Sequence, residues 1–204
     1  MPLPPRKSEG PLNPEIERLL YQVKVVREDG AGLLDGLSEE QAQWAPAQGQ
    51  WSMVQCFEHL NVSNEKLLSQ FRAAVADARQ RGILGDGPFV YGWLGRWFLK
   101  LMAPPVKRRF KAPAAFQPGP RKTLAEVREQ WESSHEELDK VIRSANGLDL
   151  ARVKVTSPAA SFLRYSLGVA FWILTAHDRR HIWQARQVRN AAGFPATAAT
   201  SSAK

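Results

Sequence analysis

Apolar side chains recur every three or four residues in four separate stretches of the chain, and this spacing places them along one face of an α-helix. The first stretch shows the pattern plainly, with Ile16, Leu19, Leu20, Val23 and Val26. No run of alternating apolar and polar residues competes for a sheet. The spacing therefore predicts an all-α protein built as a four-helix bundle.

Residues that cap helices give the expected ends of these four stretches. Asn13 precedes a proline and an acid, which is the order expected at a helix start. Ser52 and Thr123 each precede a Gln or Glu by three residues, the pattern of a capping box, and Ser38 opens a short capped turn in the same way. We expect long helices over 14 to 30–35, 52–79, 123–146, and from between 158 and 168 to about 190.

Length and composition favour one domain without disulfides. A chain of 204 residues can form one sizeable core, and its single cysteine, Cys56, excludes an internal disulfide. We expect a flexible segment over 1–12, one helical domain over 13–192 and a flexible tail over 193–204. The N-terminus does not read as a secretory signal and no stretch of 18 apolar residues occurs, so we expect a cytoplasmic protein.

Residues 79–122, between the second and third predicted helices, hold ten bases and one acid, so the net charge of +8 is a property of this insertion. Its aromatic residues favour short additional helices that form a lid over a concave site or a homodimer contact. The alternative is a non-catalytic module that binds an anionic membrane surface, with nucleic acid the less favoured partner. The candidate residues for such a surface are Arg96, Lys100, Lys107, Arg108, Arg109 and Lys111.

Three histidines form a candidate metal site. His177 and His181 stand four residues apart, so on a helix they lie about 40° apart in azimuth and about 6 Å apart along the axis. His59 can face inward from the second predicted helix, and three neutral imidazoles would leave coordination positions open, as catalytic sites do. The alternative is that these are ordinary core histidines bonded to backbone or water. His135 is expected to be a polar boundary residue rather than a fourth ligand.

Other polar residues near these histidines could orient them or approach an ion. Asp178 follows His177 but points about 100° away on the helical wheel. Alternatives exist for two of the candidates, since Glu58 could be a solvated charge and Cys56 a small buried hydrophobe. The full set of supporting candidates is Glu58, Asp178, Gln184, Cys56 and His135.

Two motifs add specificity to this reading. Residues 51–60 have the form WSxxQxxEHL, and residues 177–184 have the form HDxRHxxQ. Together they resemble the DinB/YfiT-like superfamily over roughly residues 14–192. The resemblance implies a four-helix bundle with a crossover connection, and a divalent metal, usually nickel or zinc, on the three histidines His59, His177 and His181.

The same resemblance implies an activity on a small-molecule substrate. Characterised relatives include transferases and isomerases that use a low-molecular-weight thiol such as bacillithiol or mycothiol, and others are described as metal-dependent hydrolases. We therefore expect the ion to activate water or a thiol, with no catalytic residue assigned beyond the three histidines. The long basic segment departs from the simplest family pattern, which leaves the substrate class undetermined.

Overall fold

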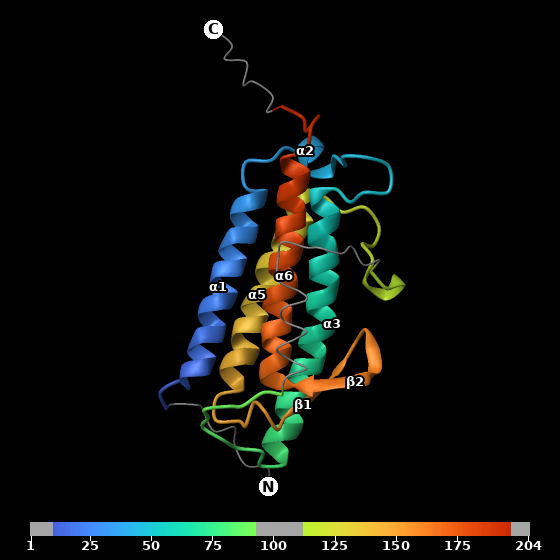
Figure 1. Ribbon diagram of the computed structural model, residues 1–204. Coiled ribbons are helices and arrows are strands. Elements are labelled where there is room, and N and C mark those ends of the chain that lie inside the picture. Colours follow the sequence, from blue (N-terminus) through green and yellow to red (C-terminus); the bar gives the residue numbers. More distant parts are fainter. Residues whose placement is uncertain (1–9, 93–111, 197–204) are drawn as a thin grey trace.

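The chain forms a four-helix bundle, as the apolar spacing predicts (Figure 1). The structure is a computed structural model and describes residues 10–92 and 112–196. Its long helices are α1 (Pro14–Leu34), α3 (Met53–Gln80), α5 (Leu124–Ser144) and α6 (Leu167–Arg189). Two short helices, α2 (Glu39–Gln43) and η1 (Ala114–Phe116), lie in the connections, and η1 is the part of the expected insertion helices that falls within the described residues.

Helices α1, α2, α3 and α5 start where the capping patterns place them, whereas α6 has no side-chain cap and was predicted only to start between 158 and 168. Ser38, Ser52 and Thr123 each accept a hydrogen bond from the backbone three residues on, and that residue's side chain bonds back to the cap, so all three capping boxes form. Asn13 caps α1 by accepting from the backbone N–H of Glu15. None of the helices that the structure describes is long and apolar enough to cross a bilayer.

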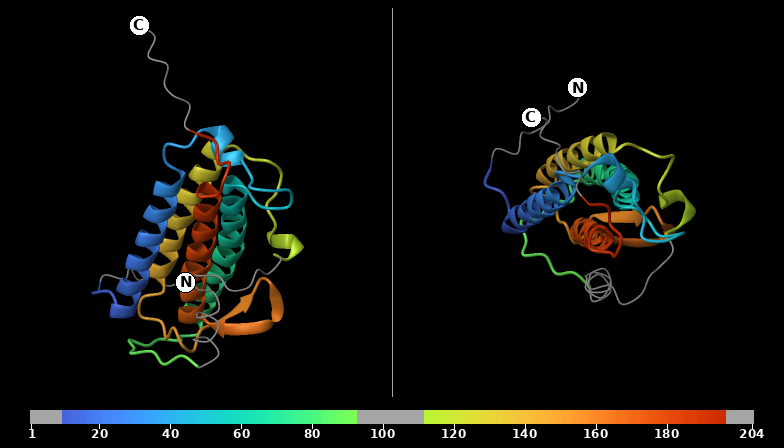
Figure 2. Two further views of the ribbon diagram at one scale, coloured as in Figure 1. Left: turned by 45° about the horizontal axis from the view of Figure 1, so that its top comes forward. Right: turned by 90° about the horizontal axis from the view of Figure 1, so that it is seen from above.

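The order of the helices around the bundle requires a long connection. Helices α1 and α3 each pack against both α5 and α6, so α1 lies diagonally opposite α3, and α5 opposite α6 (Figure 2). Helices α3 and α5 are neighbours that run in the same direction (Figure 1). The end of α3 and the start of α5 therefore lie at opposite ends of the bundle, so these two helices are joined by the expected crossover connection.

The connection from α5 to α6 contains a β-hairpin, so the expectation that nothing competes for a sheet was wrong. Strands β1 (Lys154–Ser157) and β2 (Ala160–Ser166) pair antiparallel with a register irregularity near the turn. Val155 is buried in the core while Lys154 is exposed. The alternation is only four residues long in β1, too short to stand out in the sequence.

Residues at both described ends pack against the bundle. Leu12 packs against the core at the start of α1. In the predicted tail, the ring of Phe194 lies edge-on to Trp44, with 5.6 Å between centroids, and Gln41 donates to the Pro195 carbonyl. The predicted flexible segments otherwise fall on residues 1–9 and 197–204, outside the described residues.

A close approach between α1 and α5 gives the first prediction. A Cβ atom added at Gly30 would lie 2.5 Å from the buried ring of Trp131, whereas one added at Gly32 would meet nothing within 4 Å. We expect Gly30→Ala to lower the free energy of unfolding by about 1–3 kcal/mol through overpacking. The matched control Gly32→Ala should raise it by about 0.5–1 kcal/mol because alanine favours the helix. Urea denaturation measures both, and equal stability of the two variants would contradict the packing.

Candidate metal centre

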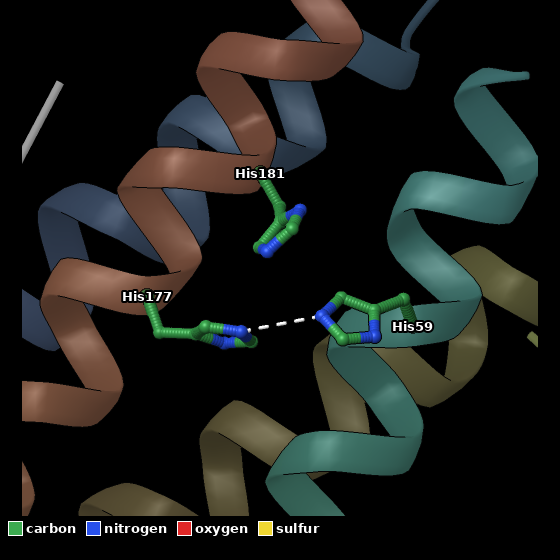
Figure 3. A group of neighbouring side chains, drawn as sticks. All are labelled: His59, His177 and His181. Atoms are coloured by element: carbon green, nitrogen blue, oxygen red, sulfur yellow. Dashed lines mark hydrogen bonds between the residues drawn. The ribbon is translucent and has the colours of Figure 1, made fainter. Parts of the chain in front are cut away.

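The fold brings His59, His177 and His181 together from two neighbouring helices (Figure 3). His59 comes from the second turn of α3, and the other two come from successive turns of α6. One ring nitrogen from each histidine lies within 4.8 Å of the others. The Nε2 atoms of His59 and His177 are 3.2 Å apart. Two nitrogens bound to one tetrahedral zinc ion at about 2.0–2.1 Å would stand about 3.3 Å apart, so this spacing fits a shared ion.

Hydrogen bonds on the outer side fix the proton of His59 and of His181. His59 Nδ1 lies 2.5 Å from the carbonyl oxygen of Phe116 in η1, and a carbonyl can only accept, so this nitrogen carries the proton. His181 Nδ1 lies 2.9 Å from Gln184 Oε1 and donates in the same way. Each ring therefore keeps an unprotonated Nε2, which is the form that binds a metal.

His177 lacks an outer partner of this kind. Its Nδ1 is buried and has no hydrogen-bond partner among the described residues. Its Nε2 faces the Nε2 of His59, which has no proton to offer because its proton is on Nδ1. The inner sides of these rings thus present nitrogen atoms to one another, an arrangement that a divalent cation between them would satisfy.

Burial keeps all three imidazoles neutral. It lowers the pKa of His59, against the opposing effect of the Phe116 hydrogen bond. It lowers the pKa of His177 far below its ordinary value, with further lowering by the other two histidines and Arg180. The pKa of His181 falls to about 3, chiefly through burial and through His59. Neutral imidazoles at pH 7 are ready to coordinate without first releasing a proton.

One aromatic ring lies against the cluster. The ring centroid of Trp51 is 5.0 Å from that of His59 and 6.1 Å from that of His181. Trp51 directly precedes Ser52, the N-cap of α3, so the cap that starts the helix also places this ring. The half-buried ring of Trp51 therefore packs beside two of the three candidate ligands.

Comparison with known proteins identifies a related family and a related fold. The family model of the DinB superfamily matches residues 22–185. The chain belongs to the DinB superfamily. Among solved structures it is similar to YfiT from Bacillus subtilis, described as a probable metal-dependent hydrolase with an unusual four-helix bundle topology, at a TM-score of 0.58 and 12% sequence identity. That similarity covers 93% of this chain and 94% of YfiT and concerns the fold. Comparison with curated proteins gives no match.

Asp178 and His135 of this DinB protein lie apart from the three-histidine cluster. His135 is fully buried, so the expectation of a boundary residue was wrong. Its Nδ1 donates to the Trp131 carbonyl, and its Nε2 is 3.3 Å from Asp178 Oδ2. Burial raises the pKa of Asp178, while the side chains of His135 and Asn64 oppose that shift.

Glu58 and Cys56 also lie outside the cluster. Glu58 is not a solvated charge: its side chain is 5% exposed and its Oε1 lies 3.0 Å from Lys122 Nζ. Cys56 is completely buried among apolar side chains, and that burial raises the pKa of its thiol to about 12. A thiol with this pKa stays protonated, so the structure favours the reading of Cys56 as a small hydrophobe.

One contributor to the site gives no signal in the sequence, and one group of predicted residues lies outside the described chain. The Phe116 carbonyl orients His59, and no side-chain pattern signals it because the contact is made by backbone. The anionic-surface candidates Arg96, Lys100, Lys107, Arg108, Arg109 and Lys111 lie outside the described residues, as does most of the predicted lid.

The metal-free chain should lose stability as the pH falls below about 6.5. The unfolded chain then protonates its imidazoles near pH 6.5, whereas the buried rings resist protonation down to lower pH, to about 3 for His181. The unfolded state therefore binds more protons, and each such histidine lowers the free energy of unfolding by up to about 1.4 kcal/mol per pH unit below 6.5.

Urea denaturation in EDTA at pH 7.5, 6.5 and 5.5 measures this loss. His181→Gln removes one titrating ring and should give a shallower decline than the unmodified chain. An unfolding free energy that stays constant from pH 7.5 to 5.5 would contradict neutral burial of the three rings.

Proposed function

We propose that this member of the DinB superfamily is a metal-dependent enzyme that binds one divalent ion on His59, His177 and His181 and acts on a small molecule. The observation that supports it best is the convergence of three neutral imidazoles, two of them with the proton fixed on the outer nitrogen. Three protein ligands leave positions for water or substrate, which is typical of catalytic rather than structural sites. Imidazole ligands suit zinc and nickel.

The residues of the chain hold the rings and restrict access to them. Phe116 and Gln184 orient His59 and His181, and Trp51 covers one side. A bound divalent ion would supply Lewis acidity, lowering the pKa of a water or thiol toward neutrality. The fold similarity to YfiT supports water as the nucleophile, and hence a hydrolase.

A thiol-dependent transfer is the second form of this proposal. The resemblance of the two motifs to the superfamily supports it, because characterised relatives include transferases and isomerases that use low-molecular-weight thiols. Cys56 would not supply the thiol, since it is buried and its pKa is raised to about 12. The thiol would come from a cofactor such as bacillithiol or mycothiol. The anionic-surface module remains a separate prediction, as does a homodimer.

Metal titration tests the site without knowledge of the substrate. Zn²⁺ or Ni²⁺ added to the EDTA-treated, tag-free chain should bind at one ion per chain and raise the melting temperature, by the equivalent of about 2.7 kcal/mol at a free ion concentration 100 times Kd. The His177→Ala/His181→Ala variant should show neither effect. Stoichiometric binding that survives in this double variant would contradict the proposed ligands.

Gln184 gives a graded test of the orienting hydrogen bond. Gln184→Ala removes the acceptor from His181 Nδ1, and we expect metal affinity to fall about 10- to 100-fold while the fold is kept. Gln184→Glu retains an acceptor oxygen and should bind more tightly than the alanine variant. Equal affinities of the alanine variant and the unmodified chain would show that this contact does not orient the ligand.

Activity assays separate the two forms of the proposal. The metal-loaded chain would be screened against small esters and amides, and against electrophiles offered together with bacillithiol or mycothiol. Turnover that needs metal but no thiol supports the hydrolase, and turnover that needs both supports the transferase. Turnover retained after removal of His177 and His181 would exclude metal-dependent catalysis at this site.

A further inference from the structure

A buried polar pair spans the diagonal of the bundle. His135 lies on α5 and Asp178 on α6, both side chains are 0% exposed, and Nε2 of the first is 3.3 Å from Oδ2 of the second. Helices α5 and α6 oppose each other across the bundle, so this contact lies between helices that are not neighbours (Figure 2). The remaining ring nitrogen of His135 donates to the Trp131 carbonyl, which holds the imidazole in place on its own helix.

Stability alone does not account for this pair. Removing two polar groups of this kind from water is costly, and apolar residues of similar volume in their place often leave a protein equally or more stable. Neither side chain belongs to the cluster of His59, His177 and His181 that could hold an ion. Nε2 of His135 and both carboxylate oxygens of Asp178 are buried without a hydrogen bond that meets ordinary geometric criteria among the described residues, although the two groups face each other at 3.3 Å. A role in placing other residues is the best-supported use of such buried polar groups.

The contact made by Asp178 bears on how α6 is rotated about its own axis. Successive residues of a helix point about 100° apart, so three consecutive residues can face the three other helices of the bundle. On α6 these contacts pair His177 with His59 of α3, Asp178 with His135 of α5, and Arg179 with Gln22 of α1. The middle contact is the one made at the centre of the bundle.

Small rotations of α6 would disrupt the metal centre. A turn of about 20° moves an atom about 6 Å from the helix axis by about 2 Å. Bonds from a metal to its protein ligands hold to within about 0.2 Å of their usual length. Apolar contacts alone restrain rotation weakly because neighbouring side chains can repack. A polar contact with one favourable partner restrains it more strongly.

We propose that His135 and Asp178 are positioning residues, which fix the rotation of α6 so that His177 and His181 meet His59. This inference rests on the proposed function, since it concerns the same site. The pair acts through shape and polar contact with its partner helix, so a neutral side chain of the same shape at position 178 would serve as well.

The test compares zinc affinity with the stability of the metal-free chain at one fixed pH. Zn²⁺ dissociation constants would be measured by competition with a chromophoric chelator, and melting temperatures in EDTA. For His135→Leu/Asp178→Leu we expect a melting temperature at or above that of the unmodified chain and zinc affinity weakened at least 10-fold. Asp178→Asn keeps the shape and can donate to His135 Nε2, so its affinity should stay within 3-fold.

Two further variants complete the experiment. Asp178→Ala removes the contact without adding bulk and should also lose at least 10-fold in affinity, which decides the matter if the leucine pair does not fold. Arg72→Gln/Glu137→Gln is the matched control, because it breaks an exposed pair between α3 and α5 and should leave zinc affinity unchanged.

Unaltered zinc affinity in both the leucine pair and Asp178→Ala would overturn the inference and leave the proposed function standing. An Asp178→Asn affinity as weak as that of Asp178→Ala would also overturn it, because the charge of Asp178 rather than its position would then matter. Failure of the unmodified chain to bind zinc or nickel would instead defeat the proposed function, and this inference with it.

Discussion

The hydrogen bond between His59 Nδ1 and the Phe116 carbonyl joins the crossover connection to the histidine cluster. The carbonyl belongs to η1, within the segment that returns along the bundle between α3 and α5. By fixing the proton of His59 on its outer side, the contact leaves the inner nitrogen free to bind an ion. The rest of the proposed chemistry depends on that protonation pattern.

The helix order explains why this contact is available. Since α3 and α5 are parallel neighbours, a short turn cannot join them, and the connection has to pass along the bundle. This path brings a backbone carbonyl beside the second turn of α3, where His59 lies. On the neighbouring helix α6, Gln184 accepts from His181 as the Phe116 carbonyl accepts from His59, but from within the same helix. One ligand is thus oriented by tertiary structure and the other by its own helix.

The starts of α1, α2, α3 and α5 could be predicted because they depend on local chemistry. Ser52 and Thr123 cap through residues three positions away, and that spacing is visible in the chain. The pairing of His177 with His181 follows equally from helical periodicity. The contribution of Phe116 could not be predicted, because every residue has a backbone carbonyl and nothing in the sequence marks this one. Its partner, His59, is also 57 residues away.

Asp178 and His135 show a second limit of prediction from the sequence. The helical wheel correctly separates Asp178 from His177 by about 100°, which reads as a weak link to the site. In the bundle the same angle directs Asp178 to the centre, where it meets His135. A helical wheel describes one helix alone, whereas the role of a side chain depends on which residue of another helix it faces. The hairpin was missed for a related reason, since its short strands become recognisable only when paired.

Anomalous X-ray scattering from crystals of the zinc-loaded chain tests the central claim most directly. The account predicts one strong anomalous peak per chain, recorded above the zinc absorption edge, about 2.0–2.1 Å from a nitrogen of each of His59, His177 and His181. A peak at another site, or three rings that turn away from one another with no metal among them, would contradict the account.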